Sequence, residues 1–106
     1  MRKSMHKNYY EAILQIRPAS KEILAYIVSE VTKRKDVAIA KVEELKTGMD
    51  IFISSQRFAR SLGKKLKDHF KGTLTISKAI NKKDRQTGVI LYRATVLFRH
   101  SQQEDI

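Results

Sequence analysis

The run at residues 48–66 constrains the fold most, because a short strand passes there directly into an amphipathic helix. Residues 51–53 have the β-branched and aromatic character of a strand. Either Ser54 or Ser55 can cap the helix, since a serine oxygen accepts a hydrogen bond from a free N–H of the first turn. The chain therefore needs one core that receives both this strand and one side of this helix.

The helix that follows the two serines has two distinct faces when its residues are placed at about 100° intervals. The apolar face comprises Phe58, Ala59, Leu62, Leu66 and Phe70. The opposite face, roughly 160° away, presents four cations: Arg57, Arg60, Lys64 and Lys67. We expect the apolar face to anchor the helix and the cationic face to be the first candidate for a binding surface.

The charge of the chain favours a polyanionic partner. Its 106 residues match the usual size of one domain, and they carry a net charge of +11. Such a charge favours nucleic acid or an anionic membrane. Residues 57–85 contain ten cations and two carboxylates, so this segment alone has a net charge of +8. Interspersed positive and negative side chains would be enough to keep a protein soluble, so we interpret this strongly positive segment as a basic face.

The periodicity predicts the element order β-α-β-β-α-β-β. Alternating apolar residues indicate strands, and apolar residues three and four apart indicate helices. Pro18 ends the first strand, and Ser20 caps the first helix. The predicted strands are residues 9–17, 36–44, 49–53, 73–79 and 89–99; the helices run from 21 to about 34 and from the serine caps to about 70. Residues 81–88 are expected to form a polar loop.

Residues 36–44 carry mixed signals. Val37, Ile39 and Val42 favour a strand, whereas the alanine, lysine and glutamate residues among them favour a helix. A strand is preferred because residues 46–48 then form a turn into the next strand, making a hairpin. A helical turn at residues 42–45 stays an alternative.

These elements predict an α+β fold with the ferredoxin-like β-α-β-β-α-β order, extended by a C-terminal hairpin strand. Both helices should cover one face of the sheet. We expect a single domain at residues 9–99, preceded by a basic lead-in at 1–8 and followed by a polar tail at 100–106. The inward positions are expected to be Tyr10, Ala12, Leu14 and Ile16 in the first strand, Leu74 and Ile76 in the fourth, and Tyr92, Ala94, Val96 and Phe98 in the last.

The sequence offers no catalytic, metal-binding or cofactor-binding pattern. His6, His69 and His100 are scattered, and the absence of cysteine excludes thiolate metal sites. No two carboxylates are placed to converge on a substrate, and the serine pair has no visible base. We therefore expect a non-enzymatic protein with no cofactor and no small-molecule substrate. The lack of cysteine fits a cytoplasmic location, and no apolar segment is long enough to span a membrane.

The candidate nucleic-acid contacts are two groups of cations. The helix supplies Arg57, Arg60, Lys64 and Lys67, and the loop at 81–88 supplies Lys82, Lys83 and Arg85. Contacts of lysine and arginine with phosphates release counterions and give salt-sensitive affinity. Three neighbouring cations at 33–35, together with Arg93 and Arg99, add to the basic character. The aromatic residues lie on strands and are expected to pack, so base stacking is not predicted. A membrane surface is disfavoured because the helix needs its apolar face for the core.

Several runs in this chain are found together in one family. They are YYEAILQ at 9–15, KVEELK at 41–46, GMDIFISS at 48–55 with FAR at 58–60, TISK at 75–78, DRQTG at 84–88 and YRATVLFR at 92–99. This ordered set resembles the nonsense-mediated-decay protein three family, the export adaptors of the large ribosomal subunit in eukaryotes and their archaeal relatives. The later runs are similar to the archaeal version.

The resemblance implies a non-enzymatic factor that binds the large ribosomal subunit, touching ribosomal RNA and ribosomal proteins in a biogenesis or export-adaptor role. Family members usually carry Cys-x-x-Cys zinc modules before this region, and this chain has no cysteine. The resemblance implies no individual contact residues, so the contact residues proposed here rest on charge alone. The alternative is a protein-interaction module in which a sheet edge or apolar strands dock another domain and the charge serves solubility. A small nuclease is a third, weaker alternative.

Overall fold

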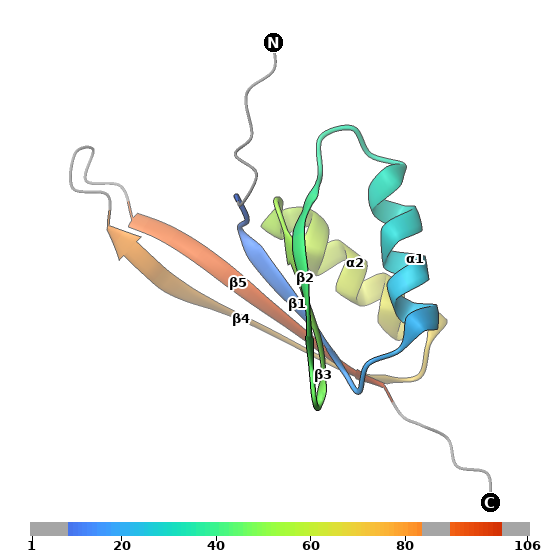
Figure 1. Ribbon diagram of the computed structural model, residues 1–106. Coiled ribbons are helices and arrows are strands. Elements are labelled where there is room, and N and C mark those ends of the chain that lie inside the picture. Colours follow the sequence, from blue (N-terminus) through green and yellow to red (C-terminus); the bar gives the residue numbers. More distant parts are fainter. Residues whose placement is uncertain (1–8, 84–89, 101–106) are drawn as a thin grey trace, which may run out of the picture.

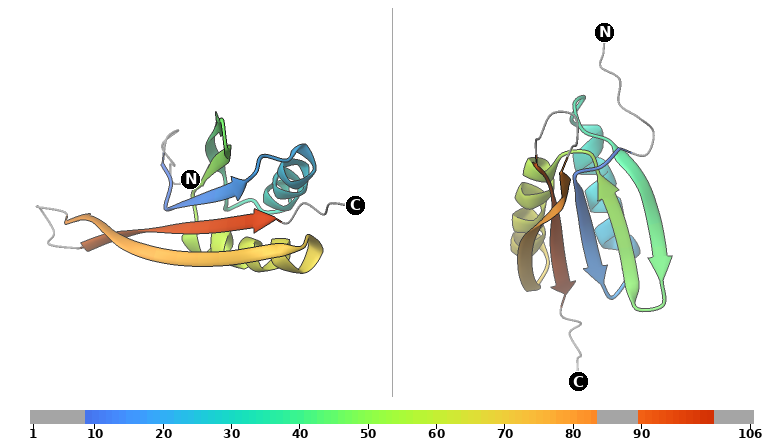
Figure 2. Two further views of the ribbon diagram at one scale, coloured as in Figure 1. Left: turned by 90° about the horizontal axis from the view of Figure 1, so that it is seen from below. Right: turned by 90° about the vertical axis from the view of Figure 1, so that its left-hand side faces the viewer.

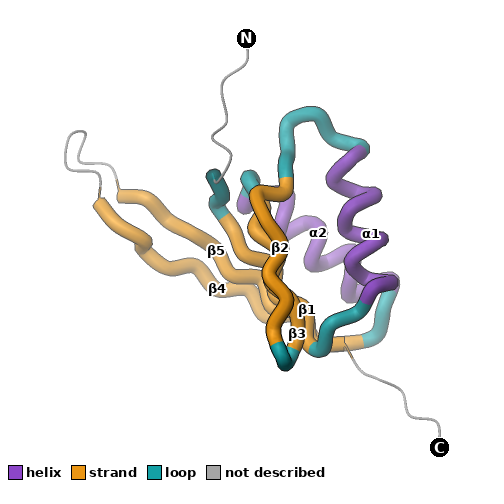
Figure 3. Tube along the Cα trace, in the orientation of Figure 1, coloured by secondary structure: helices purple, strands orange, loops and turns teal. Residues whose placement is uncertain are grey.

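A computed structural model of the chain describes residues 9–83 and 90–100 (Figure 1). The predicted order of strands and helices is confirmed, and residues 36–44 supply a strand rather than a helical turn. The elements are β1 (Ala12–Arg17), α1 (Lys21–Thr32), β2 (Ile39–Leu45), β3 (Gly48–Ile53), α2 (Gln56–His69), β4 (Gly72–Lys83) and β5 (Ile90–His100). Figure 3 shows the two helices beside the sheet, with loops and turns between the elements.

The five strands form one sheet in the order β2-β3-β1-β5-β4. β1 pairs antiparallel with β3 and parallel with β5, so the sheet is mixed. In the first half, β3 lies between β1 and β2, as the split β-α-β pattern requires. In the second half, the additional strand β5 is inserted between β1 and β4, and it pairs antiparallel with β4. The predicted α+β fold with an extra hairpin strand is therefore confirmed.

Both helices cover the same face of the sheet, as the two views of Figure 2 show. The register places Leu14 of β1 opposite Ile51 of β3 and Val96 of β5, so these side chains form one row on the helix side. All three are fully buried. α1 contributes the stripe Ile23, Ile27 and Val31, and α2 contributes Phe58, Ala59, Leu62 and Leu66. The two layers thus share a single core.

The capping residues follow the sequence expectations. The Ser20 hydroxyl accepts a hydrogen bond from the Ile23 N–H at 3.2 Å and begins α1. Of the two serines before α2, Ser55 is the cap, since its hydroxyl accepts from the Phe58 N–H at 3.1 Å. Ser54 is buried, and its hydroxyl accepts a hydrogen bond from the Ala38 N–H at 2.9 Å. Ser54 therefore ties the entry to β2 to the end of β3.

Of the predicted inward positions, Tyr10 is wrong, and Ile76 lies on the helix side of the sheet but is not buried. Tyr10 was assigned to the side of Ala12, but regular pairing begins only at β1, and the Tyr10 ring contacts Phe52 on the face without helices. Ile76 is 37% exposed, because β4 is the outermost strand and gives its side chains a neighbour on one side only. The side chain of Tyr92 lies outside the described part of the structure.

The β4–β5 hairpin extends beyond the rest of the sheet. β1 pairs with β5 only from Ala94 onward, so residues 79–83 and 90–93 pair only with each other. We call these two segments the arm, and Figure 1 shows it pointing away from the helices. Residues 81–83 belong to β4, so the loop predicted at 81–88 is wrong for these residues; backbone pairing with β5 extends the strand despite its polar sequence. Residues 84–89 lie outside the described residues.

Candidate nucleic-acid interface

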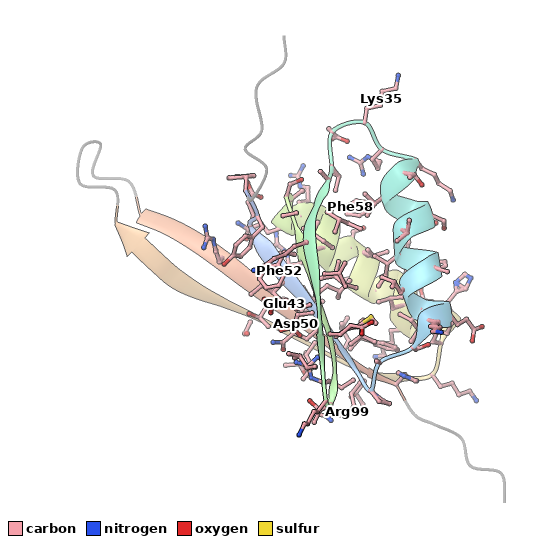
Figure 4. All side chains as sticks on the ribbon, in the orientation of Figure 1. Lys35, Glu43, Asp50, Phe52, Phe58 and Arg99 are labelled. Carbon is pink, nitrogen blue, oxygen red and sulfur yellow. The ribbon has the colours of Figure 1, made fainter. Side chains whose placement is uncertain are left out.

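The position of α2 is set by close packing on the hairpin. A Cβ atom on Gly63 would come 2.7 Å from Val96 Cγ1 and 2.9 Å from Leu74 Cδ1, so only glycine lets the helix approach β5 and β4 this closely. Phe58 and Leu66 hold the two ends of the same face in the core. Figure 4 labels Phe58 on the helix side of the sheet. The remaining sides of α2 face solvent or α1.

The four predicted helix cations form one continuous surface, which we call the basic ridge: Arg57, Arg60, Lys64 and Lys67. Arg57, Lys64 and Lys67 are exposed, and Arg60 is half-buried. Within the described ranges, none of the four forms an ion pair with a carboxylate. The Arg60 guanidinium donates one hydrogen bond, to Gln56 Oε1 at 3.1 Å. At the usual rise of an α-helix, the ridge is about 15 Å long.

Lys65 lies on α2 as well, but it faces α1 and is engaged there. Its Nζ donates a hydrogen bond to Glu30 Oε1 at 2.9 Å, and Lys33 Nζ donates to Glu30 Oε2 at 3.0 Å. These two hydrogen bonds lower the pKa of Glu30, and the bond from Lys65 raises the pKa of the lysine in turn. A ring contact of 4.7 Å between Tyr26 and His69 joins the same two helices. Lys65 is therefore a cation that holds α1 to α2, outside the ridge.

The cations at 33–35 are mostly engaged within the fold. Arg34 forms two hydrogen bonds with the carboxylate of Asp36, at 3.1 and 3.0 Å, and they lower the pKa of that carboxyl group. The Arg34 guanidinium also lies 5.3 Å from the centre of the Phe58 ring. Lys35 is exposed and points away from the helices in Figure 4. This cluster consequently offers a polyanion less free charge than its sequence indicates.

The predicted loop cations lie on or beyond the arm. Lys82 and Lys83 end β4, and Arg85 lies outside the described residues. The arm ends next to Ala94, which is in register with Ala12 of β1 and, through it, with Ile53 at the end of β3. Since α2 follows β3 directly, the arm extends from the end of the sheet where α2 begins (Figure 2). Arg57 is thus the ridge cation at the arm end, and Lys67 is at the opposite end.

The sheet face without helices carries a further set of contacts that the sequence did not indicate. The Arg93 guanidinium lies 4.1 Å from the centre of the Tyr10 ring. The Tyr10 and Phe52 rings pack edge to face, with 4.9 Å between their centres. Lys41 Nζ lies 4.8 Å from the centre of the Phe52 ring. These partners come from four separate segments, so only the register of the strands brings them together. As expected, Tyr10 and Phe52 pack within the protein rather than standing free.

Arg17 on the same sheet face is also engaged. Its Nη2 lies 2.9 Å from Asp50 Oδ1, and its Nη1 donates to the carbonyl oxygen of Met49 at 3.1 Å. The Arg17–Asp50 contact is an ion pair by distance, and Asp50 Oδ1 has no hydrogen-bond partner among the described residues. Four further cations outside the ridge have a carboxylate partner among the described residues: Lys33, Arg34, Lys41 and Lys65.

A comparison with protein families identifies the chain. A family model described as "NMD3, second domain" matches residues 9–99. The chain belongs to the NMD3 family. This confirms the family resemblance of the sequence, and the NMD3 family is linked to the export and biogenesis of ribosomal subunits. A search of curated proteins finds no match to the chain.

Two further findings concern the described part of this NMD3-family domain. Among residues 9–83 and 90–100, no three histidine, aspartate or glutamate side chains gather as metal ligands would. Neither described helix is long and apolar enough to cross a membrane. Of the residues predicted as contact sites, the structure brings the four ridge cations onto one surface and places two of the three loop residues on the separate arm.

Proposed function

We propose that this NMD3-family domain is a non-enzymatic module that binds the large ribosomal subunit in the cytoplasm and contacts ribosomal RNA through its basic ridge. In this role it acts in ribosome biogenesis or as part of an export adaptor, beside ribosomal proteins. The family membership supports an association with ribosomal subunits in general. The choice of RNA as the partner, and of the ridge as the contact, rests on the arrangement of charge.

The absence of ion pairs along the ridge is the observation that carries this proposal. Arg57, Arg60, Lys64 and Lys67 follow one side of a well-anchored helix, and none pairs with a carboxylate of the described chain. Cations without protein partners can exchange their water and counterions for phosphates, and the released counterions favour binding. A helix held by a buried face keeps the four charges at fixed spacing, so little order is lost when they bind.

The arm supplies a second proposed contact. Lys82 and Lys83 end β4, and Arg85 follows in the chain. Because the arm extends from the end of the sheet where α2 begins, one polyanion that follows the ridge past Arg57 would meet the arm next. Two separated groups of cations would raise both the affinity and the number of counterions released.

Co-sedimentation with purified large and small ribosomal subunits over a salt series tests the proposal. The test protein is the full chain, and the variant carries Gln in place of Arg57, Arg60, Lys64 and Lys67. A control variant loses four exposed cations elsewhere and therefore has the same net charge: Lys21, Lys35, Lys46 and Arg99. Replacing all four ridge cations should lower the salt slope by about 3 if each contacts a phosphate.

Selective, salt-sensitive binding to the large subunit that is lost in the ridge variant and kept in the control is the expected result. Equal loss in both variants would mean that overall charge, and not the ridge, drives binding. Equal binding to both subunits would reduce the domain to a general polyanion binder. Unchanged binding by the ridge variant would contradict the proposal directly.

A further inference from the structure

The two edges of the sheet differ in how they are protected. The β2 edge has an irregular register between Ile39 and Lys41, and its exposed residues include the ion pair of Lys41 with Glu43 at 3.2 Å. Bulges and charged side chains are the usual means by which proteins keep an edge strand from pairing with another chain. The β2 edge is thus guarded against strand addition.

The β4 edge lacks this protection over much of its length. Residues 73–77, Thr-Leu-Thr-Ile-Ser, contain no charged residue and no proline. Their pairing with β5 is regular, and the first irregularity in β4 lies between Ile80 and Lys82. In the described chain, no strand pairs with the other side of β4. Thr73, Thr75 and Ser77 are exposed, and so is Ile76 on the helix side. An uncharged, regular edge of this kind is a template for another strand.

Positive charge flanks this edge on the helix side. Arg60, Gly63 and Lys67 are spaced three and four residues apart, so they form one stripe along α2. Gly63 in the middle of the stripe packs on Leu74 of β4, so Arg60 and Lys67 lie on the side of α2 that faces the hairpin. Lys71, in the short connection between α2 and β4, is also exposed. A strand added to β4 would run alongside these cations.

We infer that the β4 edge at residues 73–77 binds an extended acidic segment of a protein partner as an additional strand of the sheet. Backbone hydrogen bonds to β4 would supply the affinity, and acidic side chains on the helix side would meet Lys67 and Lys71. A second copy of this chain fits less well, since pairing two β4 edges would bring two basic surfaces together. Nucleic acid has no backbone that extends a β-ladder. This partner differs in class from the RNA proposed above, although both proposals use Lys67 as a contact.

A peptide-binding experiment on the full chain tests the inference. The probe is a fluorescein-labelled peptide of ten residues that alternates threonine and glutamate. One control peptide is identical but carries methyl groups on its four central backbone nitrogens, which keeps the charge and removes ladder donors. A second control has lysine in place of glutamate. Anisotropy measures binding, and hydrogen exchange of the backbone amides locates it.

The expected result is saturable binding of the acidic peptide alone, with slower amide exchange confined to β4 residues 73–77. Replacing Lys67 and Lys71 by Gln should weaken binding about three- to tenfold at low salt. The matched control replaces Lys35, in the connection between α1 and β2, and Lys46, in the turn between β2 and β3 at the opposite edge of the sheet; both are exposed, and this variant should bind like the wild type. Equal net charge in the two variants separates a local effect from a general one.

Four outcomes would overturn the inference. Equal binding of the backbone-methylated peptide would show that charge alone attracts the probe. Equal binding of the lysine peptide would remove the role of the flanking cations. Slower amide exchange at β2 instead of β4 would show that the peptide binds the opposite edge of the sheet. Self-association of the chain with protection of residues 73–77, measured by sedimentation without peptide, would make a second copy the occupant.

Discussion

Gly63 of α2 lies directly over Leu74 of β4, so close that a Cβ atom at position 63 would come within 2.9 Å of Leu74 Cδ1. Val96 Cγ1 of β5 would be 2.7 Å from the same Cβ atom. This contact draws α2 onto the β4–β5 hairpin. It therefore determines which way the basic ridge faces, although Gly63 itself carries no side chain.

A valine at position 63 tests this packing. Gly63→Val should lower the free energy of unfolding by about 2 kcal/mol or more, because the added methyl groups overlap with a fully buried valine and the neighbouring leucine. Urea denaturation of both proteins measures the change. In the Gly63→Val background, Leu74→Ala should cost less stability than in the wild type, since the smaller residue makes room. Additive effects of the two substitutions would contradict a direct contact.

The two serines before α2 should differ in how their loss affects the protein. Ser55→Ala removes the helix cap and should cost about 1 kcal/mol of stability. Ser54→Ala removes the acceptor of the part-buried hydrogen bond from the Ala38 N–H and should cost about 1 kcal/mol. Amide exchange distinguishes them, with faster exchange at Phe58 in the first variant and at Ala38 in the second. The same exchange pattern in both variants would contradict the separate roles.

The contact of Glu30 with Lys65 and Lys33 predicts a dependence of stability on pH. Hydrogen bonds from both lysines hold the pKa of Glu30 below its ordinary value of 4.5 in the folded protein. The unfolded chain therefore binds this proton more readily, so the stabilisation is present above pH 4.5 and is lost as the pH falls through the lowered pKa. Glu30→Gln should cost on the order of 1 kcal/mol at pH 7.

Urea denaturation from pH 7 to pH 2.5 measures this effect. The difference in stability between wild type and Glu30→Gln should shrink toward zero at the acid end of the range. The stability difference between wild type and Lys65→Gln should also shrink toward low pH. It should be smaller than the difference for Glu30→Gln, because Lys33 still donates a hydrogen bond to Glu30 in that variant. A difference that stays constant with pH would mean that the carboxylate charge of Glu30 contributes nothing.

Single substitutions along α2 separate ridge cations from structural ones. Each of Arg57→Gln, Lys64→Gln and Lys67→Gln should lower the salt slope of RNA binding by about 0.7–0.9, the share of one phosphate contact. Lys65→Gln should leave that slope nearly unchanged, because Lys65 already pairs with Glu30 at 2.9 Å. Binding of a labelled ribosomal RNA fragment at several salt concentrations provides the measurement. A loss at Lys65 equal to that at Lys64 would contradict the distinction.

The local sequence was sufficient to predict the order of helices and strands and the buried face of each helix. The spacing of Phe58, Leu62 and Leu66 predicted the buried side of α2, and all three are buried. The alternation of Ala12, Leu14 and Ile16 likewise predicted the core side of β1. Such patterns can be read along the chain because helices and strands repeat with fixed periods, and the core must lie on one side of each. The same periodicity failed at Tyr10, which precedes the regular part of β1.

Strand order and charge pairing were beyond the reach of local patterns. The hydrophobic pattern of β5 fits several places in a sheet, and its position between β1 and β4 depends on pairing across long separations in the chain. Lys65 and Lys64 are neighbours in sequence with the same side-chain chemistry, yet Lys65 meets Glu30 from α1 while Lys64 has no carboxylate partner in the described residues. A sequence contains each residue's charge but not its distance from the others.

The sequence by itself therefore determined the α+β class, the element order, the basic face of α2 and the family to which the chain belongs. Only the tertiary structure decided which cations among the described residues lack a carboxylate partner, where the arm projects and which sheet edge is unguarded. The physical reason is the separation along the chain over which each interaction acts. Periodicity and capping act within a few residues, whereas ion pairs, strand order and edge exposure depend on contacts between segments far apart in the chain.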